Sequence, residues 1–144
     1  MTENKNSNSE IRNTISKTAP KKSKAYDLEE RTFAFAKKVR GFVRKLPRTM
    51  SNIEDGKQPL KSSGSVGANF IEASDPLSAK DFMLRIKICR KEAKESRYWL
   101  RLIDTGGKQE LEGERIELQE EAEELMKIFG SIVRKNQKDI DNLG

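Results

Sequence analysis

One stretch of the sequence decides the fold: residues 80–103, which read KDFMLRIKICRKEAKESRYWLRLI. Its apolar and small residues recur in alternating steps of four and three, which is the spacing of one face of an α-helix. This face consists of Phe82, Ile86, Cys89, Ala93, Ser96, Leu100 and Ile103. We therefore predict a helix over residues 76–104, about 40 Å long at roughly 1.5 Å per residue.

The residues on either side of this stretch mark where the helix begins and ends. Asp75 followed by Pro76 is typical of a helix start, and Ser78 with Asp81 offers a second capping pattern. Gly106 and Gly107 readily adopt the left-handed backbone that closes a helix. The chain is therefore expected to reverse direction on both sides.

Three further segments show helical spacing of apolar residues: 26–46, 60–74 and 111–136. Residues 51–59, SNIEDGKQP, have the Asn, Asp, Gly and Pro of a loop. The predicted inward faces are Leu28, Thr32, Phe35, Val39, Phe42, Val43 and Leu46 in the first, Ser63, Val66, Gly67, Phe70, Ile71 and Ser74 in the second, and Leu111, Leu118, Ala122, Leu125, Phe129 and Ile132 in the last. The sequence predicts an all-α protein, an antiparallel up-down-up-down four-helix bundle.

The composition divides the chain into one domain and two tails. Residues 1–24 have six basic and two acidic residues and almost nothing to bury, so we expect a disordered basic tail. Residues 25–138 should form the bundle, and residues 139–144 a C-terminal tail. At 144 residues, one hydrophobic core is the expected number.

The residue types that are missing argue against several classes of function. The chain has no histidine and one cysteine, Cys89, which falls at an apolar helix position and is expected to be an ordinary core residue. We therefore expect no enzyme activity, no metal site and no cofactor. No apolar run is long enough for a membrane span, and the first residues lack a signal peptide, so a cytoplasmic location is expected.

The run of small residues at 62–68, SSGSVGA, is unusual for a helix because glycine costs about 1 kcal/mol relative to alanine there. One interpretation is that small side chains let a neighbouring helix approach closely. The other is a backbone cradle for phosphate, but the run lacks the spacing of a nucleotide-binding loop. We favour close packing.

Basic and acidic residues are segregated along the chain. Seven basic residues and no acid lie between Arg31 and Arg48, whereas eight glutamates and one arginine lie between Glu110 and Glu124. The basic run predicts a polyanion partner, with Lys37, Lys38, Arg40, Arg44 and Lys45 as its ligands. In an antiparallel bundle the glutamates would lie near the end of this run, so mutual neutralisation is the alternative.

A second apolar stripe is present on the last two predicted helices, at Leu84, Ile88, Met126 and Ile128. Large exposed apolar patches are uncommon on monomers, so this stripe predicts contact with another subunit. Tyr98 and Trp99 lie beside a helix seam, where subunit packing is favoured over stacking on a base. We include Trp99 among the expected oligomer contacts.

Several polar residues suit the interface between helices. Glu72, Glu92 and Glu95 are candidate paired carboxylates, but without histidine we expect them to form salt bridges with Lys61, Arg90 or Arg97. Asn69 is expected to donate or accept a hydrogen bond across a helix interface.

Two segments, KSSGSVGANFIEAS at 61–74 and KEAKESRYWL within 80–103, resemble the four-helix bundle protein family first known from reading frames inside 23S rRNA intervening sequences. Lys61 departs from the arginine that is common there, which would weaken a bidentate salt bridge at this position. The resemblance implies a closed ring of identical subunits, commonly a homopentamer. It also implies a fold related to the accessory variability protein of diversity-generating retroelements, a basic barrel that works with a reverse transcriptase and nucleic acid.

Two functions remain after these arguments. The first is a non-enzymatic oligomeric bundle that binds RNA or DNA through its basic surfaces. The second is a structural scaffold that binds a protein partner and has no nucleic-acid role.

Overall fold

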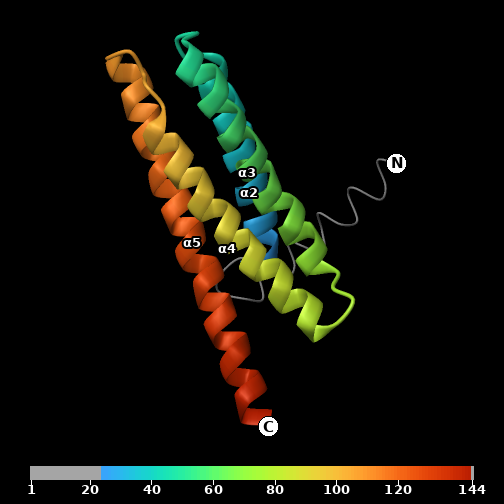
Figure 1. Ribbon diagram of the computed structural model, residues 1–144. Helices are drawn as coiled ribbons and strands as arrows, with labels where there is room; N and C mark the ends of the chain where they lie inside the picture. Colours follow the sequence, from blue (N-terminus) through green and yellow to red (C-terminus); the bar gives the residue numbers. More distant parts are fainter. Residues whose placement is uncertain (1–23, 144) are drawn as a thin grey trace, which may run out of the picture.

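The computed structural model describes residues 24–143, which form four α-helices joined by short turns. α2 spans Lys24–Arg44, α3 Met50–Ser74, α4 Ala79–Leu102 and α5 Gln109–Leu143. Successive helices run in opposite directions and pack side by side, and α5 also contacts α2 (Figure 1). The described chain therefore has the all-α, up-down-up-down arrangement that the apolar spacing predicts, without strands. The expected tail of residues 1–24 lies outside the described residues except for Lys24.

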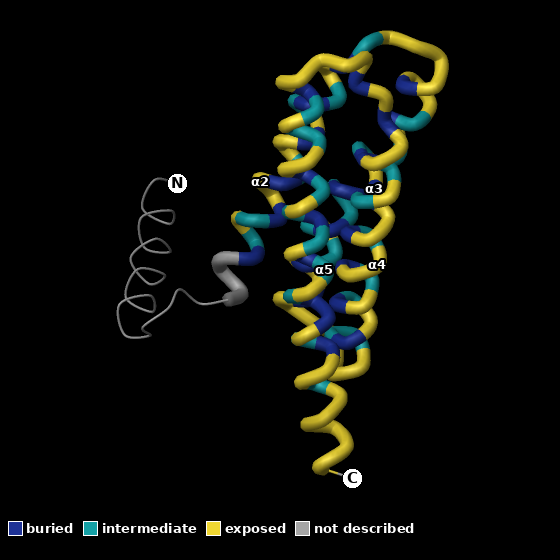
Figure 2. Tube along the Cα trace, turned by 90° about the vertical axis from the view of Figure 1, so that its left-hand side faces the viewer, coloured by how far each residue is buried: buried dark blue, intermediate teal, exposed yellow. Residues whose placement is uncertain are grey.

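The core is a continuous apolar seam to which every helix contributes. Figure 2 shows buried residues on the inner side of all four helices and exposed residues over the last turns of α5. The rings of Phe70 and Phe129 lie 6.1 Å apart, which joins α3 to α5. The largest fully buried apolar side chains are Phe35, Phe42, Ile86, Leu100, Leu125 and Phe129, all on the predicted faces.

The prediction that residues 51–59 form a loop is wrong, because α3 begins at Met50 and continues through Pro59. Thr49 caps the helix, and its side-chain oxygen accepts a hydrogen bond from the Asn52 amide at 3.1 Å. Proline normally disrupts a helix interior at a cost of about 3 kcal/mol. Here Pro59 is fully buried, so packing in the core offsets the lost hydrogen bond.

The first turn of α3 is held by contacts to a distant part of the chain. The buried Asn52 side chain donates to the Pro47 carbonyl at 3.0 Å and to the Asp104 carbonyl at 2.7 Å. Its carbonyl oxygen accepts a hydrogen bond from the Asp104 amide at 3.1 Å. These bonds tie α3 to the loop after α4, which lies 52 residues further along the chain.

The second of the two capping patterns begins α4, at Ala79 instead of the expected residue 76. The Ser78 hydroxyl accepts a hydrogen bond from the Asp81 amide at 3.0 Å, and the Asp81 carboxylate accepts one from the Leu77 amide at 3.1 Å. Asp75 instead closes α3 by donating its amide hydrogen to the Glu72 carbonyl. The short residue Ser78 therefore provides the cap that starts α4.

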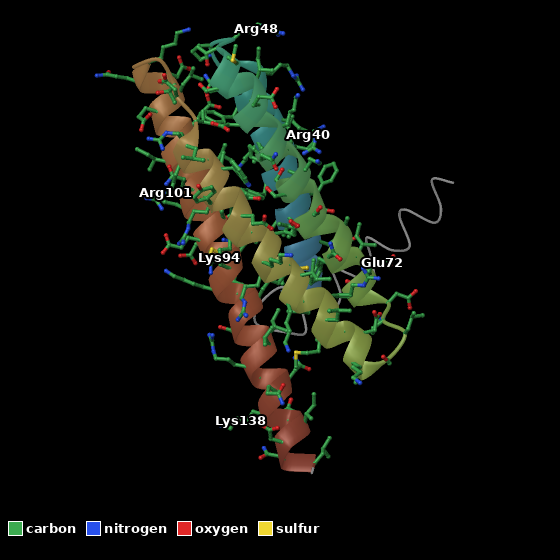
Figure 3. The ribbon with its side chains drawn as sticks, viewed as in Figure 1. Arg40, Arg48, Glu72, Lys94, Arg101 and Lys138 are labelled. Carbon is green, nitrogen blue, oxygen red and sulfur yellow. The ribbon has the colours of Figure 1, made fainter. Side chains whose placement is uncertain are left out.

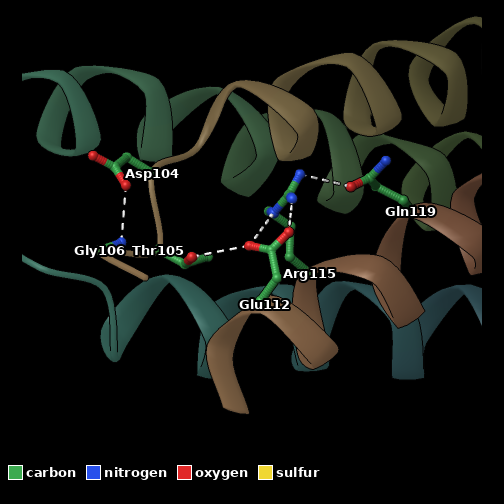
Figure 4. Close-up of polar contacts among 6 residues, drawn as sticks. All are labelled: Asp104, Thr105, Gly106, Glu112, Arg115 and Gln119. Atoms are coloured by element: carbon green, nitrogen blue, oxygen red, sulfur yellow. Dashed lines mark hydrogen bonds and ion pairs between the residues drawn. The ribbon is translucent and has the colours of Figure 1, made fainter. Parts of the chain in front are cut away.

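α3 ends at Ser74 as predicted, and the remaining helix ends differ from the prediction by two to seven residues. α2 ends at Arg44 and α4 at Leu102, whereas α5 continues to Leu143 and includes most of the residues expected as a C-terminal tail. Gly106 and Gly107 have φ values of 70° and 75°, in the left-handed region expected of them. They lie in the α4–α5 turn, where the Gly106 amide donates to the Asp104 carboxylate at 2.8 Å (Figure 4).

The start of α5 is fastened to this turn by a small polar network (Figure 4). Thr105 donates its hydroxyl hydrogen to the Glu112 carboxylate at 2.9 Å. Arg115 forms an ion pair with the same carboxylate and donates to Gln119 at 2.9 Å.

None of the helices in the described part of the chain combines the length and apolar character needed to cross a membrane.

The small residues of α3 allow α2 to approach closely. This agrees with the interpretation favoured from the sequence, close helix packing instead of a cradle for phosphate. A Cβ atom added at Gly67 would lie 3.3 Å from the Thr32 hydroxyl oxygen, and one added at Gly56 would lie 3.2 Å from a Val43 methyl carbon. Both distances are tighter than ordinary van der Waals contact. The absence of these side chains allows the two helices to pack against each other.

Candidate nucleic-acid interface

Acidic residues of α5 neutralise part of the basic face of α2. Arg31 donates two hydrogen bonds to the Glu121 carboxylate, at 2.8 Å from Nε and 2.7 Å from Nη2. The Nζ atom of Lys45 lies 2.6 Å from the Glu114 carboxylate. Lys45, a predicted ligand of nucleic acid, therefore has an acidic partner within the protein.

Three other predicted ligands, Lys37, Lys38 and Arg44, are exposed. Among the described side chains, none of the three has an acidic partner within salt-bridge distance. The Nζ atom of Lys37 lies 5.8 Å from the centre of the Phe33 ring, near the outer limit of a cation–π contact. These three charges are therefore available to an external anion.

Arg40 is held in place by backbone oxygens of two helices. Its guanidinium donates to the Ala36 carbonyl at 3.0 Å and to the Leu60 carbonyl at 3.3 Å. A Cβ atom added at Gly64 would lie 3.2 Å from Nη2 of Arg40, so the glycine makes room for this side chain. Carbonyl oxygens do not cancel its charge, and Arg40 therefore presents a fixed positive group beside α3.

Lys37, Arg40 and Arg44 border a groove of about 830 Å³ between α2 and α3, called here the α2–α3 groove. Phe33, 62% exposed, and Ile71, 57% exposed, are its large apolar residues. The other lining residues are Glu29, Glu30, Thr32, Ala36, Lys37, Arg40, Arg44, Gly64, Gly67 and Ala68. The groove therefore combines an apolar surface with three basic side chains and two carboxylates.

A second basic face, on α4, escaped the sequence analysis. Lys80, Lys87, Lys94 and Arg101 recur every seven residues, a spacing that was visible in the sequence and that places them along one side of a helix. In Figure 3 Lys94 and Arg101 lie toward α5, whereas Arg40 lies at the opposite edge of the ribbon beside α3.

The α4 face continues onto α5, because Arg90 and Arg134 both border Gly130. After Arg85, which pairs with Asp81, α4 carries six further basic residues, and none of them forms an ion pair within the described residues. They are Lys87, Arg90, Lys91, Lys94, Arg97 and Arg101. α2 and α4 are diagonal in the bundle, since each packs chiefly against α3 and α5. The described part of the chain therefore carries two separate basic faces.

The polar residues expected at helix interfaces differ from one another in their contacts. Asn69 accepts a hydrogen bond from Arg85 of α4 at 3.1 Å and donates one to the Ser65 carbonyl at 2.9 Å. Lys61 and Glu72 are exposed. Among the described residues, the shortest hydrogen bond between α3 and α4 joins two residues that were not among the predicted polar contacts, the buried hydroxyls of Ser62 and Ser96, at 2.7 Å.

Glu92 and Glu95 lie about one helical turn apart on α4. Burial raises the pKa of the Glu92 carboxyl, the adjacent Glu95 raises it further, and Lys91 acts in the opposite direction. As far as the structure describes the chain, the expected ion pairs of these glutamates with Lys61, Arg90 or Arg97 do not form. The described residues also contain no cluster of three or more side chains suited to hold a metal ion.

The apolar residues expected at a subunit interface fall into two groups. Leu84 is 55% exposed, whereas Ile88, Met126 and Ile128 are half-buried, the last two against the core of the same chain. Trp99 is half-buried and packs edge-on against the exposed ring of Tyr98, with 5.1 Å between ring centres. The most exposed large apolar residues of α4 are Leu84, Tyr98 and Leu102.

Comparisons with known proteins agree with the family resemblance seen in the sequence and with the fold. A sequence model of the 23S rRNA-intervening sequence protein family matches residues 21–131. The fold is similar to the crystal structure of a protein with unknown function from the S23 ribosomal protein family of Bacteroides thetaiotaomicron. The two share 27% identity with a TM-score of 0.67, and the match covers 78% of this chain and 99% of the other. No curated protein matches the chain.

Proposed function

The chain belongs to the 23S rRNA-intervening sequence protein family, and we propose that it is a non-enzymatic, ring-forming homo-oligomer that binds nucleic acid through its basic faces. The observation that carries this proposal is the set of basic side chains on α2 and α4 without acidic partners among the described residues. Such charges replace condensed counterions on a phosphate backbone and so favour binding.

The pairing of charges within the bundle supports this choice. Glu114 and Glu121 are already engaged with Lys45 and Arg31, so these two acids of α5 do not neutralise the rest of α2. The full chain keeps a net charge of +6. Residues 1–24 hold +4 of this charge, and within the bundle the basic side chains without acidic partners among the described residues lie on two elongated faces. This distribution suits a long polyanion better than a small ligand.

Subunit assembly is part of the proposal and strengthens the expected binding. Leu84, Tyr98 and Leu102 share the outer face of α4 and would be covered by a neighbouring subunit. The expected number of subunits, five, follows from the family resemblance. Several basic faces on one ring bind a long nucleic acid with greater avidity than one chain alone.

The test is a titration of a fluorescent RNA hairpin with the full chain at about 50 mM and about 200 mM salt. The triple variant Lys37→Gln, Lys38→Gln, Arg44→Gln should bind more weakly and depend less on salt. The matched control is Lys45→Gln, which removes a charge already paired to Glu114 and should have a smaller effect. Arg40 is left unchanged because its hydrogen bonds join α2 to α3.

Two outcomes would contradict the proposal. The first is a parent protein that binds neither the hairpin nor a DNA duplex at about 50 mM salt. The second is a triple variant that binds as tightly as the parent. The same exposed apolar residues of α4 would then support the alternative, a structural scaffold that binds a protein partner.

A further inference from the structure

The geometry points to the α2–α3 groove as a binding site for single-stranded nucleic acid, with an unpaired base against Phe33 and phosphates against Lys37, Arg40 and Arg44. This inference rests on the proposed function and adds to it the kind of nucleic acid and the place where it binds. Neither basic residues alone nor an exposed aromatic ring alone would specify a single strand.

The aromatic ring provides the first part of the argument. Phe33 is 62% exposed although it lies in the middle of α2, where the neighbouring positions Thr32 and Phe35 are almost completely buried. Single-stranded nucleic acids stack their bases on exposed aromatic side chains, because every base has a π face. The bases of a duplex already stack on each other and are not available to such a ring.

The order of side chains along α2 provides the second part. Phe33, Lys37, Arg40 and Arg44 follow one another at intervals of four, three and four residues, so they lie along one side of the helix. They span about 16 Å at roughly 1.5 Å per residue. A stacked strand rises by about 3.4 Å per nucleotide, so this distance accommodates a few nucleotides.

The opposite wall of the groove provides the third part. Gly64, Gly67 and Ala68 have no long side chains to fill the space, and Ile71 adds an apolar surface. Arg40 needs no rearrangement to face a phosphate, because its guanidinium is already held by the carbonyls of Ala36 and Leu60. A preorganised donor loses less conformational entropy when a ligand binds.

The charges of the groove also orient the strand. Glu30 lines it toward the start of α2, and Arg44 lines it at the opposite end. Carboxylates repel phosphates but accept hydrogen bonds from the amino groups of bases. The phosphates should therefore lie toward Arg44 and the base toward Phe33.

The experiment measures the affinity of the full chain for a 12-nucleotide oligoadenylate and for the duplex of that strand with oligouridylate. Phe33→Ala should weaken binding of the single strand about tenfold and leave duplex binding unchanged, since base stacking contributes only to the former. Phe33→Trp keeps an aromatic surface and should retain the affinity. Ile53→Ala is the matched control, an exposed apolar residue of α3 that does not line the groove.

The remaining outcomes separate this inference from the proposed function. If Phe33→Ala binds the single strand as well as the parent while the triple basic variant loses affinity for both probes, the inference is wrong and the proposed function stands. If the parent binds neither probe, both are wrong. If Phe33→Ala changes only the oligomer mass in light scattering, the groove is a contact between copies of the chain, and the inference is also wrong.

Discussion

Asn52 illustrates how a single residue joins distant parts of this fold. Its side chain makes hydrogen bonds to Pro47 and Asp104 and so connects the turn before α3 with the turn after α4. The side chain is buried, and each of its polar atoms has a partner. A buried polar group without partners costs about 1–3 kcal/mol, so these matched bonds favour one arrangement of the two turns.

The thiol of Cys89 is a second residue whose environment has a measurable consequence. It is completely buried and donates a hydrogen bond to the Val66 carbonyl at 3.4 Å. Burial raises the pKa of this thiol to about 12, because the thiolate is poorly solvated in the core. Cys89 is therefore a core residue, as its apolar position predicts.

This pKa leads to a prediction on stability at high pH. The unfolded chain releases the thiol proton near its ordinary pKa of 9.0, whereas the folded chain keeps it until about pH 12. The contribution of the thiol is thus fully present below pH 9 and is lost as the pH rises toward 12. Urea unfolding of the parent and of Cys89→Ala should give a stability difference that shrinks over this range. A difference that stays constant would contradict the prediction.

At the scale of elements, one glycine of α3 and one of α5 lie in opposite environments. Gly67 faces Thr32 of α2, whereas a Cβ atom added at Gly113 of α5 would meet nothing within 4 Å. Glycine in an open helix interior costs about 1 kcal/mol relative to alanine. Of these two glycines, Gly67 has a packing reason to accept that cost and Gly113 has none.

The prediction is that the same substitution has opposite signs at the two positions. Gly113→Ala should raise the free energy of unfolding by up to about 1 kcal/mol. Gly67→Ala should lower it, because Thr32 is buried and its hydroxyl is bonded to the Glu29 carbonyl, so it has little freedom to move. Urea denaturation measures both values, and a stabilising Gly67→Ala would show that α2 and α3 are not in close contact.

The basic face of α4 leads to a prediction for nucleic-acid binding. The triple variant Lys87→Gln, Lys94→Gln, Arg101→Gln should reduce the slope of log affinity against log salt by about 2 to 3, if each side chain neutralises one phosphate. Helicity by circular dichroism should not change, because among the described residues these three side chains make no ion pair. An unchanged salt slope would restrict the interface to α2.

At the scale of the whole molecule, assembly should appear in the mass of the particle. Light scattering at micromolar concentration should return a multiple of 16.4 kDa, with five subunits expected. The double variant Leu84→Glu, Tyr98→Glu places charges on the exposed apolar face of α4 and should lower this mass without loss of helicity. A parent mass of a single chain would contradict the proposed ring.

The sequence by itself determined the helical fold, the core and the family. Phe35, Ile86 and Phe129 could be assigned to the core because helical periodicity is a local property, present in any window of about four turns. The family was visible in residues 61–74 and 80–103, and the family match over residues 21–131 confirms it.

Only the tertiary structure decided which basic side chains lack an acidic partner among the described residues and at which residue α3 begins. Lys37 and Lys45 both belong to the basic run between Arg31 and Arg48, and the sequence does not distinguish them. In the structure Lys45 pairs with Glu114 of α5, whereas Lys37 pairs with no acid among the described residues. Similarly, residues 51–59 contain loop-forming types, yet they are helical because Asn52 bonds to Asp104 and Pro59 is buried in the core. Both results depend on partners that are far away in the sequence, and local residue patterns carry no information about such partners.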